Sequence, residues 1–154
     1  MEAFLGQIGM GLALGLAALG SALGIGAAGR AAAGAWAKDT KAGKRLDYRY
    51  IIFVSMPLTQ LFYAFLLLLI GLKAAVYDPV NVAAHAGALF SIGLACGLGE
   101  MFSAWLQGLI GAAACRCVSE SEGANPLVFL IIAMGIVETV GLFSFILLWL
   151  MLPS

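Results

Sequence analysis

The residue of this sequence with the clearest chemical potential is a carboxylate in the middle of an apolar stretch. Glu138 lies between segments 135–137 and 140–142, which contain only glycine, isoleucine, valine and leucine. Asn125 and Pro126 are a favourable helix start, and at about 1.5 Å per residue Glu138 lies roughly 18 Å into that helix. An ionisable group inside a bilayer is costly and marks a candidate functional site. Its partner must come from another helix or from a bound ion.

A second polar group lies on an otherwise apolar segment. Met56, Thr59, Gln60 and Tyr63 are spaced i, i+3, i+4 and i+7, which places them on one face of a helix. Pro57 removes a backbone hydrogen bond within that helix. Pro57 perturbs the turn around Met56, and carbonyl oxygens left free in this way can serve as ligands where backbone lines a site.

Gln107 adds a further amide to these groups. Together they offer a carboxylate, two amide oxygens, a hydroxyl and a carbonyl, which are hard oxygen donors suited to alkali and alkaline-earth cations. One negative charge in a low dielectric favours a monovalent cation over a divalent one. The extra oxygens favour sodium over a proton. Two other interpretations stay open: hydrogen bonds to a protonated Glu138, and polar contacts between helices with no bound ion.

The composition assigns the chain to the membrane. It has 154 residues, of which 63% are hydrophobic and 10% are charged. A membrane-spanning helix needs about 20 apolar residues. Such stretches lie near residues 4–37, 50–76, 82–115 and 126–152. We therefore predict an all-α membrane protein with four transmembrane helices, no room for a soluble catalytic site, and no nucleic-acid partner.

The positions of the basic residues predict the orientation. The segment 116–125 contains Arg116, and the loop between the second and third helices has only Lys73 at its edge. The positive-inside rule then predicts cytoplasmic loops at 38–49 and 116–125, with both termini outside. The N-terminal stretch lacks the basic region of a signal peptide, so we expect it to be a retained helix. The basic residues of the first loop are Lys38, Lys41, Lys44, Arg45 and Arg49.

The chain is predicted to consist of two tandem helical hairpins, residues 1–76 and 77–154. The first and third helices are rich in glycine and alanine, whereas the second and fourth are rich in leucine and aromatic residues. Small residues allow close approach of membrane helices. A ring with slim helices inside and bulky ones outside would use this asymmetry. On composition alone, an ordinary four-helix bundle fits equally well.

At these residues the sequence resembles the proteolipid, or K, subunit of bacterial V-type sodium ATPases. The resemblance covers essentially the whole chain and is carried by the segments Pro57-Leu58-Thr59-Gln60-x-x-Tyr63, Ser103–Gly108 and Val137-Glu138-Thr139. It implies a homo-oligomeric rotor ring in the bacterial inner membrane, surrounded by lipid. It also implies a stator subunit with an essential arginine, central-stalk subunits at the cytoplasmic loops, and ATP hydrolysis in a peripheral head rather than in this chain.

The resemblance also assigns roles to individual residues. It implies that sodium is bound by Glu138, Gln107, Gln60, Thr59 and the backbone of Met56, and that Tyr63 hydrogen-bonds the carboxylate. Aligning the two hairpins places Gln60 opposite Glu138, so each pair of hairpins has one carboxylate. That ratio favours an ATP-driven pump over a synthase. The alternatives are a proton-carrying version of the same rotor, and a small four-helix transporter or scaffold.

Glu100 is not explained by the resemblance. It lies two turns before Gln107 on the same face of the third helix. Three interpretations stay open: a protonated donor to a backbone carbonyl, a residue near the ion site, and a residue facing the central pore of a ring. Asp78 and His85 are expected to be ordinary residues at the outer boundary.

Overall fold

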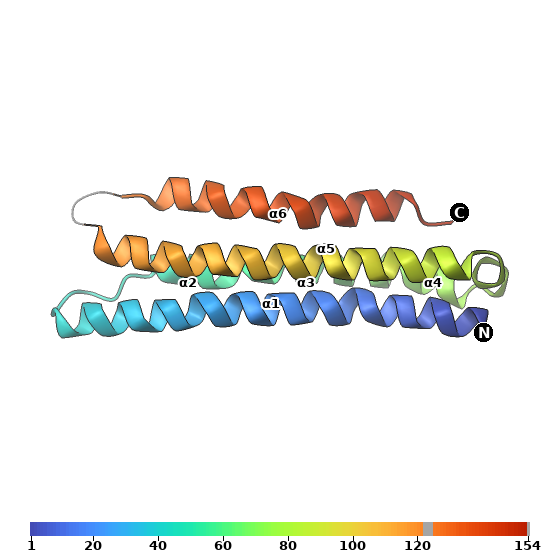
Figure 1. Cartoon of the computed structure of the whole chain (residues 1–154), viewed down its shortest axis with the longest axis horizontal. Helices are drawn as coiled ribbons and strands as arrows, with labels where there is room; N and C mark the ends of the chain where they lie inside the picture. The colour runs from blue at the N-terminus through green and yellow to red at the C-terminus, as the bar shows by residue number, and fades with distance from the viewer. Residues whose placement is uncertain (122–124, 154) are drawn as a thin grey trace.

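The computed structural model describes residues 1–121 and 125–153, and it consists of four long helical segments that lie side by side (Figure 1). The ends of the chain that the structure describes lie together at one end, and the connection 42–48, the end of α5 and the start of α6 lie at the other. Residues 122–124 of the predicted loop 116–125 are outside the described residues. Each segment is long and apolar enough to span a membrane. Their bounds are α1 Glu2–Lys41, a composite segment Arg49–Tyr77, α5 Pro79–Glu120 and α6 Leu127–Leu150. The prediction of four apolar helices is therefore confirmed.

The second segment departs from α-helical geometry at two places along its length. It is composed of α2 Arg49–Ser55, the 3₁₀ turn η1 Met56–Leu58, α3 Thr59–Leu66, the π-helical stretch η2 Leu67–Leu72, and α4 Lys73–Tyr77. The 3₁₀ turn contains Pro57, which lacks the N–H that an α-helix requires at that position. The tightened turn lies immediately before the polar face that begins at Thr59.

The two glycine-rich helices, α1 and α5, pack backbone to backbone. A Cβ on Gly93 would collide with the backbone of Gly9, and a Cβ on Gly108 would collide with that of Gly24. Such contact is possible only where side chains are absent, because membrane helices associate by close packing rather than by hydrophobicity. These contacts place α5 in the centre of the molecule, between α1 and α6 (Figure 1).

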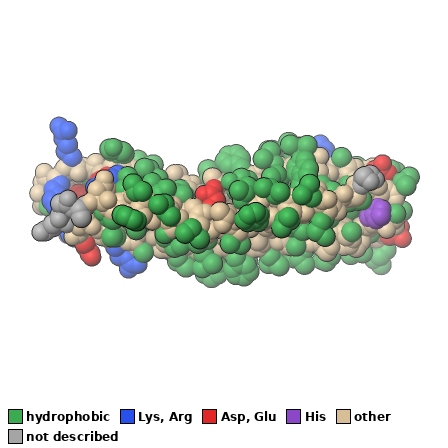
Figure 2. All heavy atoms as spheres, turned by 90° about the horizontal axis from the view of Figure 1, so that it is seen from above, with side chains coloured by type: hydrophobic (Ala, Val, Ile, Leu, Met, Phe, Trp, Pro, Cys, Tyr) green, Lys and Arg blue, Asp and Glu red, His purple; other side chains and the backbone are tan. Residues whose placement is uncertain are grey.

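The bulky helices present their large side chains outward. Phe62 on α3 and Phe143 on α6 are exposed, as are many leucine, isoleucine and valine side chains of the same segments. Figure 2 shows a surface that is hydrophobic along most of its length, with charged side chains gathered mainly at the two ends. This distribution fits an outer layer in contact with lipid, as the contrast between slim and bulky helices predicts.

The helix α5 begins at a well-defined N-terminal cap. The Oδ1 atom of Asp78 accepts hydrogen bonds from the backbone N–H groups of Val80 (2.8 Å) and Asn81 (3.1 Å). Helical geometry is interrupted at His85, where φ is −128° and ψ is 21°. Asp78 and His85 therefore shape the connection between the hairpins, which agrees with their predicted boundary role.

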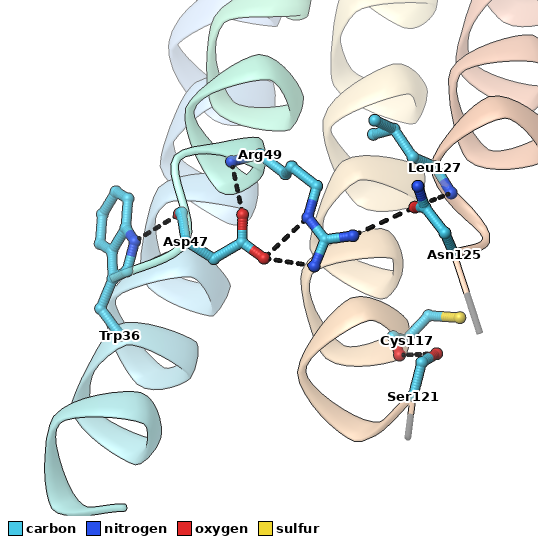
Figure 3. Close-up of polar contacts among 7 residues, drawn as sticks. All are labelled: Trp36, Asp47, Arg49, Cys117, Ser121, Asn125 and Leu127. Carbon is cyan, nitrogen blue, oxygen red and sulfur yellow. Dashed lines mark hydrogen bonds and ion pairs between the residues drawn. The ribbon is translucent and has the colours of Figure 1, made fainter. Parts of the chain in front are cut away.

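At the opposite end, a polar cluster joins the first connection to the second (Figure 3). Asp47 accepts hydrogen bonds from the backbone N–H (2.9 Å) and Nε (2.7 Å) of Arg49, and its carbonyl accepts one from Trp36 Nε1 (2.9 Å). Arg49 also donates from Nη1 to Asn125 Oδ1 at 3.1 Å. The same Asn125 oxygen accepts from the N–H of Leu127 at 3.3 Å, where α6 begins. One arginine thus fixes the ends of two hairpins relative to each other.

Substitution of Gly93 tests the contact between α1 and α5. Gly93→Ala places a methyl group against the Gly9 backbone, and overpacking of this kind costs about 1–3 kcal/mol. Gly87→Ala on the same helix is the control, because nothing lies within 4 Å of its added Cβ. We expect Gly93→Ala alone to lower the temperature at which circular dichroism of the purified protein loses its helical signal. Equal behaviour of the two variants would contradict this packing.

The Asp47–Arg49 pair predicts a dependence on pH at this end of the molecule. The side-chain hydrogen bond from Arg49 holds the pKa of Asp47 below its ordinary value of 3.8. A depressed pKa adds stability above the unfolded pKa, and this stability is lost as pH falls through the folded pKa. We expect the protection of amides in residues 42–48, measured against the exchange rate of an unstructured chain at the same pH, to fall once pH drops below about 4, and Asp47→Asn to remove that step. An identical exchange profile in the variant would show that the pair does not hold the loop.

Candidate ion-binding site

The carboxylate of Glu138 lies at the centre of α6 and is held from two neighbouring helices. Tyr63 on α3 donates from its hydroxyl to Oε1 at 3.2 Å, and Gln107 on α5 donates from Nε2 to Oε2 at 3.2 Å. Glu138 itself is partly exposed, on the outer side of the molecule. Both carboxylate oxygens are therefore acceptors in this arrangement, while part of the Glu138 side chain remains at the surface of the chain.

Two buried glutamine side chains continue the network into the interior. Gln60 and Gln107 are both 0% exposed, and Gln60 Nε2 donates to Gln107 Oε1 at 3.1 Å. The same Gln60 nitrogen donates to the hydroxyl of Ser103 at 3.1 Å, and Ser103 donates to the carbonyl of Val137 at 2.9 Å. Buried amides satisfied in this way fix the distance between α3, α5 and α6 at mid-membrane.

Three further oxygen atoms meet on the opposite side of Gln60. The hydroxyl of Thr59 lies 3.0 Å from the carbonyl oxygen of Met56 and 3.1 Å from Oε1 of Gln60. The Met56 carbonyl is presented by the 3₁₀ turn that contains Pro57. Here the irregular geometry of the second segment contributes directly to the site, because the turn brings a backbone oxygen beside two side-chain oxygens.

The position of Tyr63 is fixed by aromatic packing. Its ring stacks on Phe145 of α6 with a centroid distance of 5.8 Å, and Phe145 in turn packs edge-on against Trp149 at 5.6 Å. Phe145 lies seven residues after Glu138, two turns along the same helix. The aromatic contact therefore holds the Tyr63 hydroxyl at the height of the carboxylate that it donates to.

The structure brings all the residues proposed from sequence into one hydrogen-bonded network. It contains Ser103 as well, which we did not predict as a site residue although it lies within the segment that carries the family resemblance. The signal was present: Ser103 precedes Gln107 by four residues and so shares its helix face. The predicted members are Met56, Thr59, Gln60, Tyr63, Gln107 and Glu138.

Glu100 lies inside the four-helix unit, packed against α6. It is 0% exposed, and a Cβ on Gly141 would lie 2.5 Å from its Oε2 atom. The pore-facing interpretation is therefore wrong, because this face of α5 is covered by α6. Donation to a backbone carbonyl is not observed either, since neither oxygen has a hydrogen-bond partner among the residues that the structure describes. The remaining interpretation, a position beside the ion site, agrees with its place one turn from Ser103.

The network combines charge and donor groups in a way that suits a small cation. Its single partly exposed carboxylate accepts hydrogen bonds from Tyr63 and Gln107, and the network continues through Gln60 to the Thr59 hydroxyl and the Met56 carbonyl. In residues 1–121 and 125–153 the structure has one ion pair, Asp47–Arg49, which lies in the connection before α2 and not at Glu138. An ionised Glu138 in this position requires a positive partner, because an unpaired buried charge is strongly unfavourable.

A comparison with known protein families identifies the chain. The family of ATP synthase C subunits matches twice, at residues 8–70 and 90–151, so the matched segments cover well over half of the sequence. Each matched segment spans parts of two neighbouring helices, and together they include every residue of the network above. A search of curated proteins found no match. The chain therefore belongs to the family of ATP synthase C subunits and is a non-catalytic, ion-carrying component of the membrane rotor ring of a rotary ATPase.

Proposed function

We propose that this protein carries sodium and belongs to a V-type rotary ATPase of the bacterial inner membrane. The observation that carries this proposal is the set of oxygen atoms in the hydrogen-bonded network that ends at Glu138. A proton carrier needs a carboxylate in apolar surroundings, whereas this site adds a hydroxyl, two amides and a backbone carbonyl. These are hard donors of the kind that bind alkali cations.

The hydrogen bonds to Glu138 support the same assignment. Both of its oxygens accept, one from Tyr63 and the other from Gln107, and neither is used as a donor. An ionised carboxylate at mid-membrane is neutralised by a metal cation, and we infer that Met56, Thr59, Gln60 and Gln107 supply the remaining ligands.

Transport follows from the charge of this one residue. With a cation bound, Glu138 is neutral and its partly exposed position can face lipid as the ring turns. Without a cation, the charge is too costly in lipid and must stay near a positive group. We propose that this group is the essential arginine of the stator subunit, with access paths for the ion on either side of it.

The two halves of the chain differ in a way that favours pumping. Gln60 and Glu138 lie at mid-span on the bulky helix of each proposed hairpin, 1–76 and 77–154, and only the second is a carboxylate. One cation per two hairpins lowers the number of ions moved per ATP for a ring of given size. A lower ratio allows transport against a steeper gradient, which is the requirement of an ATP-driven pump.

The orientation proposed from the basic residues is compatible with the arrangement of the helices. The basic loop 38–49 and the described part of 116–125 lie at the same end of the molecule, opposite both termini (Figure 1). We propose that this end is cytoplasmic and that it contacts the central-stalk subunits.

Labelling with a hydrophobic carbodiimide separates sodium from proton transport. The reagent attacks a protonated carboxyl group, so bound sodium should slow the labelling of Glu138 at fixed pH. We expect a rate that falls with sodium concentration in the purified ring, and Glu138→Gln to abolish both labelling and ion-coupled turnover. Labelling of Glu138 that is indifferent to sodium would instead establish the proton-carrying version of the rotor.

Substitution of Thr59, with Thr139 as the control position, tests whether the hydroxyl of Thr59 is a sodium ligand. Thr59→Ala removes an oxygen of the network, and loss of a hydrogen-bonding group to a charge costs about 1.5–3 kcal/mol, or about 10- to 150-fold in sodium affinity. The matched control is Thr139→Ala, whose hydroxyl is exposed and donates to the Ile136 carbonyl of its own helix (2.6 Å). Sodium affinity measured by protection from carbodiimide should fall in the first variant only. Equal affinity in both would remove Thr59 from the ligand set.

A further inference from the structure

A second carboxylate lies deeper in the molecule than the site described above. Glu100, Ser103 and Gln107 are spaced i, i+3 and i+7 on α5, so that they line one face of the helix. All three are buried, Glu100 completely. The function proposed above uses Gln107 and Glu138 but assigns no role to Glu100.

Glu100 and Ser103 converge on Gly141 of α6, in the gap left by its missing side chain. The position of a Cβ on Gly141 would be 2.5 Å from Glu100 Oε2 and 3.1 Å from the Ser103 hydroxyl oxygen. The two oxygen atoms therefore occupy space that a side chain at position 141 would take. The carbonyl of Val137, one helical turn before Gly141, borders the gap because it accepts the hydrogen bond from Ser103 at 2.9 Å.

The oxygen atoms around this gap can accept hydrogen bonds, but the described residues offer them no free donor. A hydroxyl has one proton, and that of Ser103 is directed at Val137. Ser103 therefore has none to offer Glu100, and its oxygen already accepts from Gln60 (3.1 Å). Both oxygens of Glu100 lack a hydrogen-bond partner within the described part of the chain. A protonated Glu100 would leave its own O–H unpaired, and an ionised one would leave a full buried charge.

A small cation resolves this conflict, because it is attracted to every group that lines the gap. We propose that Glu100 and the Ser103 hydroxyl form a second sodium-binding site inside each subunit, beside Gly141 and separate from the site at Glu138. The Val137 carbonyl supplies a further oxygen. All of these are hard oxygen donors, and one carboxylate balances one monovalent ion.

The two sites share one amide group. Gln60 Nε2 donates both to Ser103 of the inner site and to Gln107 of the outer site. A cation at either position therefore changes the hydrogen bonding at the other. The inner site is fully buried whereas Glu138 is partly exposed, so the inner ion should exchange more slowly than the outer one. The inference rests on the proposed use of sodium, but it concerns a different carboxylate.

Equilibrium binding of radioactive sodium to the purified ring tests the inference. We expect two sodium ions per chain in the unaltered ring, and one in each of Glu100→Gln and Glu138→Gln. Gly141→Ala should also lose the inner ion, because its methyl group fills the gap next to Glu100. Gly135→Ala on the same helix has nothing within 4 Å of its Cβ and should still bind two. Ring assembly of every variant is checked by its size in detergent.

These rings distinguish failure of this inference from failure of the proposed function. One ion in the unaltered ring that is lost in Glu138→Gln but kept in Glu100→Gln overturns the inner site and leaves the sodium rotor intact. One ion that is lost only in Glu100→Gln and Gly141→Ala supports the inner site and overturns sodium binding at Glu138. Absence of bound sodium in the unaltered ring overturns both. If Glu100→Gln fails to assemble, Gly141→Ala against Gly135→Ala decides the question.

Discussion

The cost of a carboxylate at mid-membrane constrains the rest of this structure. Glu138 lies halfway along a helix whose other residues are apolar, apart from a threonine and a serine, and its own helix gives it no partner. Its hydrogen bonds come instead from Tyr63 and Gln107, on two other helices. Those helices must hold their donors at the same depth, because a displacement of one helical residue, about 1.5 Å, would break a hydrogen bond of 3.2 Å.

The close contact of α1 and α5 supplies the required rigidity. Glycine opposite glycine lets the two backbones touch, so α5 has little freedom to slide or rotate against α1. Gly24 of α1 also lies against Pro57, since a Cβ there would be 3.0 Å from the proline Cβ. The same glycine therefore positions both α5, which carries Gln107, and the 3₁₀ turn, which presents the Met56 carbonyl. Glycines that are distant from the site in sequence thus determine its geometry, and the bulky helices complete it from outside.

The polar network joins three helices, α3, α5 and α6, in the interior of the chain. Ser103 connects the network to the backbone of α6 and faces Glu100, so it belongs to both halves of the polar interior. Its place could be anticipated from its spacing with Gln107. The orientation of its proton could not be anticipated, because a hydroxyl rotates toward whichever acceptor the neighbouring helix provides. That orientation is what leaves Glu100 without a donor.

The sequence by itself determined the four membrane helices, the pairing of slim with bulky segments, and the polar face that begins at Met56. These follow from composition and from the 3.6-residue period, which are local properties of the chain. Residues 79–81 and 116–120 of α5 were outside the predicted helix, because the Asp78 cap and the polar C-terminal end of α5 lie beyond the apolar run. Only the tertiary structure decided which helices meet, and therefore that Glu100 faces α6 rather than a central pore. Spacing along a helix shows which residues share a face, but what that face meets depends on contacts between segments far apart in sequence.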